Sequence, residues 1–303
     1  MDKRILGGVV LPALVAGIAH AEILKITGEF AAPNREASLL HSLSIDRIGG
    51  EDGSALARAI EQGLSGTHFD LMGGYAGQGN AEGSLTGGVT TGVDEQPFKR
   101  KEKRCVEKDS ADKKCIREEE VELRCRRRIV SVKADLRIVR NRDGRIVYSA
   151  TKPFSQESSW CEGKNDRPPP VEDVIADGVR SLGYAVREDI APTISTYDIR
   201  VRESDKGMSK DQAKRFKELV KLTKRDVRGA CDGWEAMAGE LPGNASLTFN
   251  RGLCAEQAGD YPRALELYHA AQRAGASEGG AGADRALRLI AGREDAAIRA
   301  RRR

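Results

Sequence analysis

The clearest pattern in the chain is an alternation of apolar and polar residues along residues 126–140. A period of two predicts a half-buried β-strand. The apolar positions are Val130, Val132, Ala134, Leu136 and Ile138. A turn signal follows at Asp143-Gly144, and a second alternating segment begins at Ile146. Together they predict a long β-hairpin with one face in the core.

The part of the chain before this hairpin alternates between short strands and a helix. Strands are predicted at residues 22–30, 43–48, 69–72 and 84–91. A helix is predicted from Ser54, because Leu56, Ile60 and Leu64 share one helical face. A second apolar stripe predicts a helix over residues 171–190, ended by Pro192. We therefore predict an α+β domain over residues 22–192: a mixed sheet with a long β-hairpin and packed helices.

Residues 96–120 interrupt this pattern with a strongly charged segment that carries Cys105 and Cys115. It lacks apolar alternation, so we predict an inserted extended loop or irregular hairpin in which a disulfide replaces the missing core. We treat this insertion as a candidate binding surface.

The last third of the chain is helical in pattern. Residues 193–208 are predicted as a linker or a last strand, and residues 209–303 as helices, the last of them a capping helix. The spacing of Gly252, Ala264, Tyr268 and Ala271 over two adjacent helices resembles a tetratricopeptide repeat. One repeat of this kind is 34 residues long. Moving 34 residues toward the N-terminus from Ala264 and Tyr268 identifies a degenerate copy over residues 211–244.

This resemblance implies a scaffold that binds another protein. The side chains that we propose for the partner groove are polar or aromatic residues of the better repeat. They are Phe249, Asn250, Tyr261, Tyr268 and His269.

Residues 40–192 resemble, more faintly, the envelope α/β domain of curli-secretion lipoproteins and of outer-membrane activators of penicillin-binding proteins. The matching segments, in order, are Leu43-Ser44-Ile45-Asp46-Arg47-Ile48, the helix from Ser54, Phe69-Asp70-Leu71, residues 81–89, the hairpin turning at Asp143-Gly144 and the helix from Val171. The lipid-anchor cysteine of those families is absent from this sequence, and the charged insertion is not part of their pattern. The resemblance implies a role in envelope assembly or secretion.

Residues 1–21 have the pattern of a signal peptide. Lys3 and Arg4 precede the apolar run 5–19, and Ala19-His20-Ala21 supplies a small-x-small cleavage site. We expect cleavage after Ala21, a periplasmic location and a soluble mature protein, with peripheral association with the envelope as an option.

The six cysteines are predicted to form disulfides, because an exported chain enters an oxidising compartment. If Asn141 pairs with Arg145 across the turn, then Cys125 lies opposite Cys161, which leaves Cys105 for Cys115. The last two, Cys231 and Cys254, lie at matching heights on two adjacent antiparallel helices. Zinc is the alternative for the first four, but their spacings lack the close pairs of structural zinc sites.

Charge and candidate catalytic residues add little to this interpretation. Charged residues make up 32% of the chain with a net charge of +4, and aromatic residues are rarely interleaved with the basic runs, so we expect no nucleic-acid partner. The histidines at 41, 68 and 269 have no metal-ligand spacing, and we assign no catalytic residue, metal or cofactor.

The sequence thus predicts an exported, non-enzymatic envelope protein that acts by protein–protein interaction. An accessory or regulatory subunit of a cell-wall synthesis enzyme is the alternative. A periplasmic hydrolase is the alternative of a different class.

Overall fold

The computed structural model describes residues 22–73, 80–111, 113–164 and 167–302. The predicted signal peptide therefore lies outside the described residues. The described residues divide into two compact units: 29–195 with 288–302, and 22–28 with 196–287. We predicted domains that were continuous in sequence, whereas each of these units combines two separate stretches.

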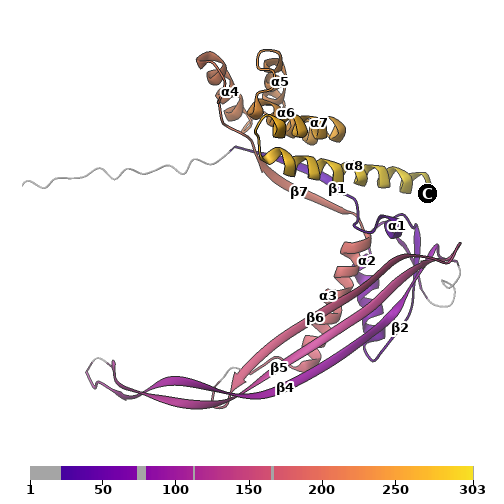
Figure 1. Cartoon of the computed structure of the whole chain (residues 1–303). Coiled ribbons are helices and arrows are strands. Elements are labelled where there is room, and N and C mark those ends of the chain that lie inside the picture. Colours follow the sequence, from indigo (N-terminus) through magenta and orange to yellow (C-terminus); the bar gives the residue numbers. More distant parts are fainter. Residues whose placement is uncertain (1–21, 74–79, 112, 165–166, 303) are drawn as a thin grey trace, which may run out of the picture. The chain divides into compact units, whose positions relative to one another are not determined.

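The larger unit contains a five-stranded mixed sheet in the order β3-β2-β4-β5-β6 (Figure 1). Strand β2 pairs in parallel with β3 and with β4, whereas β4, β5 and β6 are antiparallel. The strands are β2 Ser42–Gly49, β3 Asp70–Met72, β4 Gly83–Lys108, β5 Cys115–Arg140 and β6 Arg145–Cys161. The predicted α+β class, with a mixed sheet and a long hairpin, is confirmed.

Three helices complete this unit: α1 (Arg35–Ser38), α2 (Gly53–Leu64) and α3 (Val171–Ile190). Helices α2 and α3 lie side by side against the sheet and share its core. The close approach of the two helices depends on Gly183, where an added Cβ would lie 2.7 Å from the backbone of Ala59.

Replacing Gly183 by Val should therefore lower the unfolding free energy of this unit by about 1–3 kcal/mol, because the backbone of α2 cannot give way cheaply. Tyr184→Val places the same β-branched residue one position later, where the side chain is 58% exposed. This control should change stability by less than about 0.5 kcal/mol. Differential scanning calorimetry of the two variants tests the contact. Equal losses of unfolding free energy in the two variants would contradict it.

The C-terminal part of α8 (Glu278–Arg302) belongs to the larger unit. Its fully buried Asp295 accepts hydrogen bonds from the guanidinium of Arg35, the shortest measuring 2.6 Å. Gly292 lies so close to the chain at Glu29 that an added Cβ would approach the carbonyl oxygen to 2.1 Å. These contacts explain why the end of the predicted capping helix groups with the N-terminal half of the sequence.

The charged segment 96–120 was predicted as an extended loop or an irregular hairpin, and it forms the second of these. The segment is not a loop but a hairpin: the β4–β5 ladder continues from Gly83↔Arg140 to Lys108↔Cys115, and its register is irregular only between Cys105 and Lys108. Cross-strand ion pairs join Lys99 to Glu122 at 2.8 Å and Lys101 to Glu120 at 2.7 Å. Opposite charges can support a ladder when both faces are solvated, so apolar alternation is not required there.

The register of the β5–β6 hairpin was predicted correctly for the strand bodies but not for the turn. Arg140, not Asn141, pairs with Arg145, and a bulge then shifts the register by one residue. From Ile138↔Tyr148 onward the pairing is the predicted one, and Cys125 lies opposite Cys161. The bulge compensates for the difference at the turn.

The smaller unit is mainly helical. It contains most of the sheet formed by β1 (Ile23–Phe30) and β7 (Thr193–Arg200), so the segment predicted as a linker or last strand contains a strand. Its other elements are α4 Lys210–Leu222, α5 Val227–Ala236, the short 3₁₀ helix η1 Met237–Gly239, α6 Ala245–Gln257, α7 Tyr261–Arg273 and the first part of α8. No helix in the described part of the chain is long and apolar enough to cross a membrane.

The predicted repeat helices begin where side chains cap them. Asn244 accepts hydrogen bonds from the backbone at the start of α6, and Asp260 does the same for α7. Gly252 packs against the ring of Tyr268, where an added Cβ would be 2.9 Å from ring carbons. The predicted combination of a small residue and an aromatic ring therefore forms the contact between these two helices.

Candidate functional site

The most distinctive feature of the larger unit is a two-stranded extension of its sheet. We call residues 94–128, the outer parts of β4 and β5, the arm (Figure 1). Most of its side chains are exposed on both faces, including apolar ones such as Val106 at 45% and Ile116 at 62%. The arm adds little to the core, so ordering it is not explained by burial.

Two disulfides stabilise the arm in place of a core. Cys105–Cys115 closes its outer end, and Cys125–Cys161 links its base to β6. The surface ion pairs between the strands contribute only about 0–1 kcal/mol each, whereas each crosslink limits the unfolded chain much more strongly. The arm is thus a covalently fixed surface projecting from the sheet.

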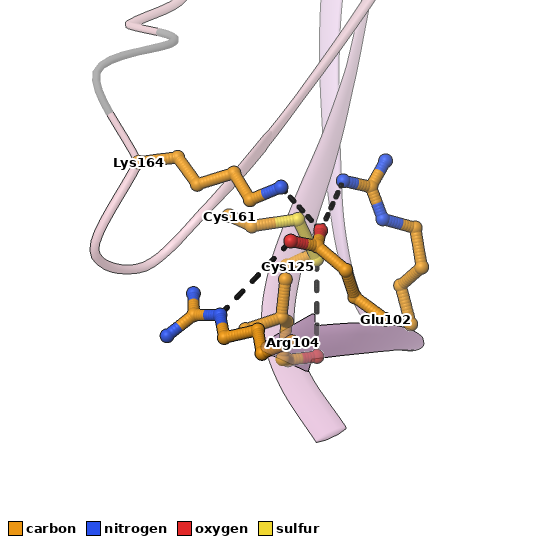
Figure 2. The surroundings of a disulfide bond; sticks show 7 residues. Glu102, Arg104, Cys125, Cys161 and Lys164 are labelled. Carbon is orange, nitrogen blue, oxygen red and sulfur yellow. Dashed lines mark hydrogen bonds and ion pairs between the residues drawn. A yellow bond between two sulfur atoms is a disulfide. The ribbon is translucent and has the colours of Figure 1, made fainter. Parts of the chain in front are cut away.

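A small cluster at the base of the arm surrounds the second disulfide (Figure 2). Leu123, Cys125 and Cys161 are buried together there. Lys164, just after β6, donates a hydrogen bond to Glu102, and Arg104 lies 4.0 Å from the same carboxylate. The hydrogen bond from Lys164, followed by the nearby positive charges, lowers the pKa of Glu102, so the contact persists at neutral pH.

The opposite face of the sheet carries the core and runs on past the end of α3. Gly178 of α3 sits over Phe154, and Pro169, just before α3, accepts a hydrogen bond from Arg128. The next row across the three strands, Pro97↔Arg126↔Trp160, therefore lies beyond the helix.

A cavity of about 750 Å³ occupies this position. Its lining residues are Pro97, Phe98, Lys99, Arg124, Cys125, Arg126, Trp160 and Glu162. Half-buried Trp160 forms an apolar part of the cavity, and the guanidinium of Arg128 lies 5.0 Å from its ring centroid. We call this the arm-base cavity.

Charge is distributed unevenly along the arm. Residues 97–101 and 122–128, next to the cavity, contain seven Lys or Arg and one acidic residue. Residues 102–120, in the outer part, contain six Lys or Arg and seven acidic residues. The base of the arm is therefore cationic, while its outer part is close to neutral.

Carboxylates near the cavity engage only some of these cations. Glu95 lies 2.5 Å from Arg128 and 3.6 Å from Arg126, and Glu122 pairs with Lys99. Arg124 makes no ion pair with a described residue, which leaves a guanidinium at the cavity available for an external anion.

All six cysteines form the three disulfides expected from the sequence, with Cys231–Cys254 joining α5 to α6 at a Cα–Cα distance of 5.7 Å. The proposed partner-binding residues behave differently. Phe249, Asn250, Tyr261 and Tyr268 are buried at 2%, 0%, 8% and 0% exposure, and only His269 is exposed. The first four belong to the packed interior because that face of each helix contacts its neighbours, so they do not form a partner groove.

One of the other histidines, His68, contacts the backbone of the chain: its Nε2 atom lies 2.8 Å from the backbone oxygen of Ser38. Among the described residues, no group of three or more His, Cys, Asp or Glu is placed to hold a metal ion.

The arm-base cavity was not predicted from the sequence, although a signal for it was present. The register that places Cys125 opposite Cys161 also places Arg126 opposite Trp160. An aromatic residue was therefore paired with a basic run, but the two are far apart in sequence and only the ladder brings them together.

Comparisons with known proteins find similarity among solved structures only. No protein-family model matches the sequence, and no curated protein matches it. Among solved structures, the chain is similar to a PelC dodecamer from Paraburkholderia phytofirmans, with 16% identity, a TM-score of 0.29, and 56% of this chain and 98% of that chain covered. It is also similar to a minor lipoprotein from Acinetobacter baumannii, with 10% identity, a TM-score of 0.23, and coverage of 48% and 88%.

Proposed function

We propose that this protein is an exported, non-enzymatic protein of the bacterial envelope that acts by binding another protein, in envelope assembly or secretion. Its arm is the contact surface in this proposal. The observation that carries it is a two-stranded ribbon, fixed by two disulfides, that exposes apolar side chains and buries few of its own. Exposed apolar side chains on an ordered projection favour a binding role over a purely structural one.

The helical unit has a supporting role in this proposal. The tight pairing of α6 with α7 through Gly252 and Tyr268 supports tetratricopeptide-type packing. Because the aromatic residues of these helices are internal, we assign partner contact to the arm and keep the helical unit as a scaffold.

If the chain is exported as proposed, its mature form has a defined N-terminus and a defined mass. Intact-mass measurement on the envelope fraction should give a chain that begins at Glu22, with six hydrogens fewer than the fully reduced form, because three disulfides are present. A mass that retains residues 1–21, or that includes a lipid, would contradict the predicted processing. A fully reduced mass would contradict the oxidising location.

The contact role of the arm can be tested in cells with a photoreactive amino acid. Placed at Ile116 or at Phe98 on the arm, it should crosslink to the same envelope protein, identified by mass spectrometry. Placed at Tyr184 of α3, which is 58% exposed and thus comparable to Ile116 at 62%, it should not. Crosslinks that are equal at all three sites, or absent from both arm sites, would reject the arm as the contact surface.

A further inference from the structure

We propose that the arm-base cavity binds an acidic peptide segment of the partner, with an apolar side chain of that segment lying against Trp160. This inference rests on the proposed function and names the chemistry of the partner. It follows from three features of the cavity: where it lies on the sheet, what lines it and how its charges are paired.

The position leaves a sheet face without a cover. Under α3, Val132 and Phe154 are packed against the helix at Gly178. Beyond α3, the row Pro97↔Arg126↔Trp160 has the same orientation, because side chains two residues apart along a strand point to the same face. At this row the cavity of about 750 Å³, and not a helix, lies over the face of the sheet.

The residues that line the cavity favour binding of one apolar side chain of the partner segment. Pro97 and Trp160 line the cavity from β4 and β6, the strands on either side of β5, and the guanidinium of Arg128 lies 5.0 Å from the ring centroid of Trp160. An aromatic or branched side chain can bury area against these rings, which is the usual role of an anchor residue in an interface.

The charges favour a carboxylate beside that group. Lys99, Arg124 and Arg126 all line the cavity, against a single acidic lining residue, Glu162. Arg124 has no ion-pair partner among the described residues. A guanidinium can hold a carboxylate through two parallel hydrogen bonds, so an acidic segment is complementary to this surface.

Trp160 provides a direct measurement of binding. The chain has only two tryptophans, and Trp234 is fully buried in the other unit. A short synthetic peptide of alternating glutamate and phenylalanine is titrated into the full mature protein while tryptophan fluorescence is recorded. A saturable change is expected, and it should be lost in Trp160→Phe.

Two double variants, each of which removes two positive charges, test the role of the cations in the cavity. R124Q/R126Q removes two cations from the cavity, and K103Q/K108Q removes two exposed cations from the outer arm. The first should weaken binding of the peptide by on the order of tenfold or more, as expected for lost charge-assisted contacts. The second should change it less than about threefold, since these lysines do not line the cavity. Equal effects, or no fluorescence change with the unmodified protein, would overturn the proposal.

Three further probes distinguish the occupant. Peptides that alternate lysine with phenylalanine, or glutamate with serine, should bind at least about tenfold more weakly. A single-stranded DNA of similar charge that binds as tightly as the peptide would overturn the proposal in favour of a general polyanion site. Light scattering that shows a dimer broken by R124Q/R126Q would instead identify a second copy as the occupant. If the arm crosslinks form in cells but the glutamate–phenylalanine peptide does not bind, the proposed function stands and this inference does not.

Discussion

Glu256→Ala should lower the unfolding free energy of the helical unit by about 3–5 kcal/mol, because it leaves a charged guanidinium without its partner in the interior. The carboxylate of Glu256 is fully buried and accepts hydrogen bonds from Arg285 at 2.5 and 2.7 Å. It also accepts hydrogen bonds from the hydroxyls of Tyr197, at 2.6 Å, and Tyr268. These four residues join β7, α6, α7 and α8 within one unit.

Burial, with the negative charge of Glu256 adding to it, raises the pKa of Tyr268, so its hydroxyl remains a donor at all ordinary pH values. The network is therefore satisfied on every side, and its stability depends on the carboxylate remaining in place. A loss of this size is a large fraction of the 5–15 kcal/mol that is typical of folded domains.

Urea unfolding followed by Trp234 fluorescence measures this effect, with Trp160→Phe as the background so that only one tryptophan reports. The matched control is Glu266→Ala on exposed α7 surface, which should cost less than about 0.5 kcal/mol. Replacing Glu256 and Arg285 together by Met should cost less than Glu256→Ala alone, since no unpaired charge remains. A double variant that is less stable than the single one would contradict this account of the network.

Replacing Cys231 and Cys254 together by Ala should lower the stability of the same unit by about 3 kcal/mol. The disulfide closes a chain segment with a sequence separation of 23 between α5 and α6, and chain-entropy arguments give a value of this size for a loop of that length. A helical array this short has few neighbouring repeats to stabilise it, so a crosslink replaces part of that stacking.

The same fluorescence measurement applies, because Trp234 lies on α5 close to the crosslink and is fully buried. The control is the double Ala variant of Cys105 and Cys115, which removes a disulfide from the arm in the other unit. It should leave the Trp234 transition unchanged. An unchanged transition in the Cys231 and Cys254 variant, or equal shifts in both variants, would show that the crosslink does not stabilise the helical unit.

Sequence alone determined the local features of this protein: the strands of the hairpin, the pairing of Cys125 with Cys161, the helices around Gly252 and the α+β class. These depend on periodicity and turn residues, which act between near neighbours in the chain. The pairing predicted at the turn was wrong, but the cysteine pairing predicted from it was correct, because a single bulge restores the predicted register along the strand bodies.

Only the tertiary structure decided which surfaces are free. Phe249 and Tyr268 have the side chains of a binding groove, but packing of α6, α7 and α8 against each other buries them. Conversely, the charged segment 96–120 is an ordered ribbon, because cross-strand ion pairs and disulfides replace the apolar pattern used to predict strands. The arm-base cavity exists where three strands continue past the end of α3, and the length of a strand relative to a helix packed on it is set by contacts between distant segments.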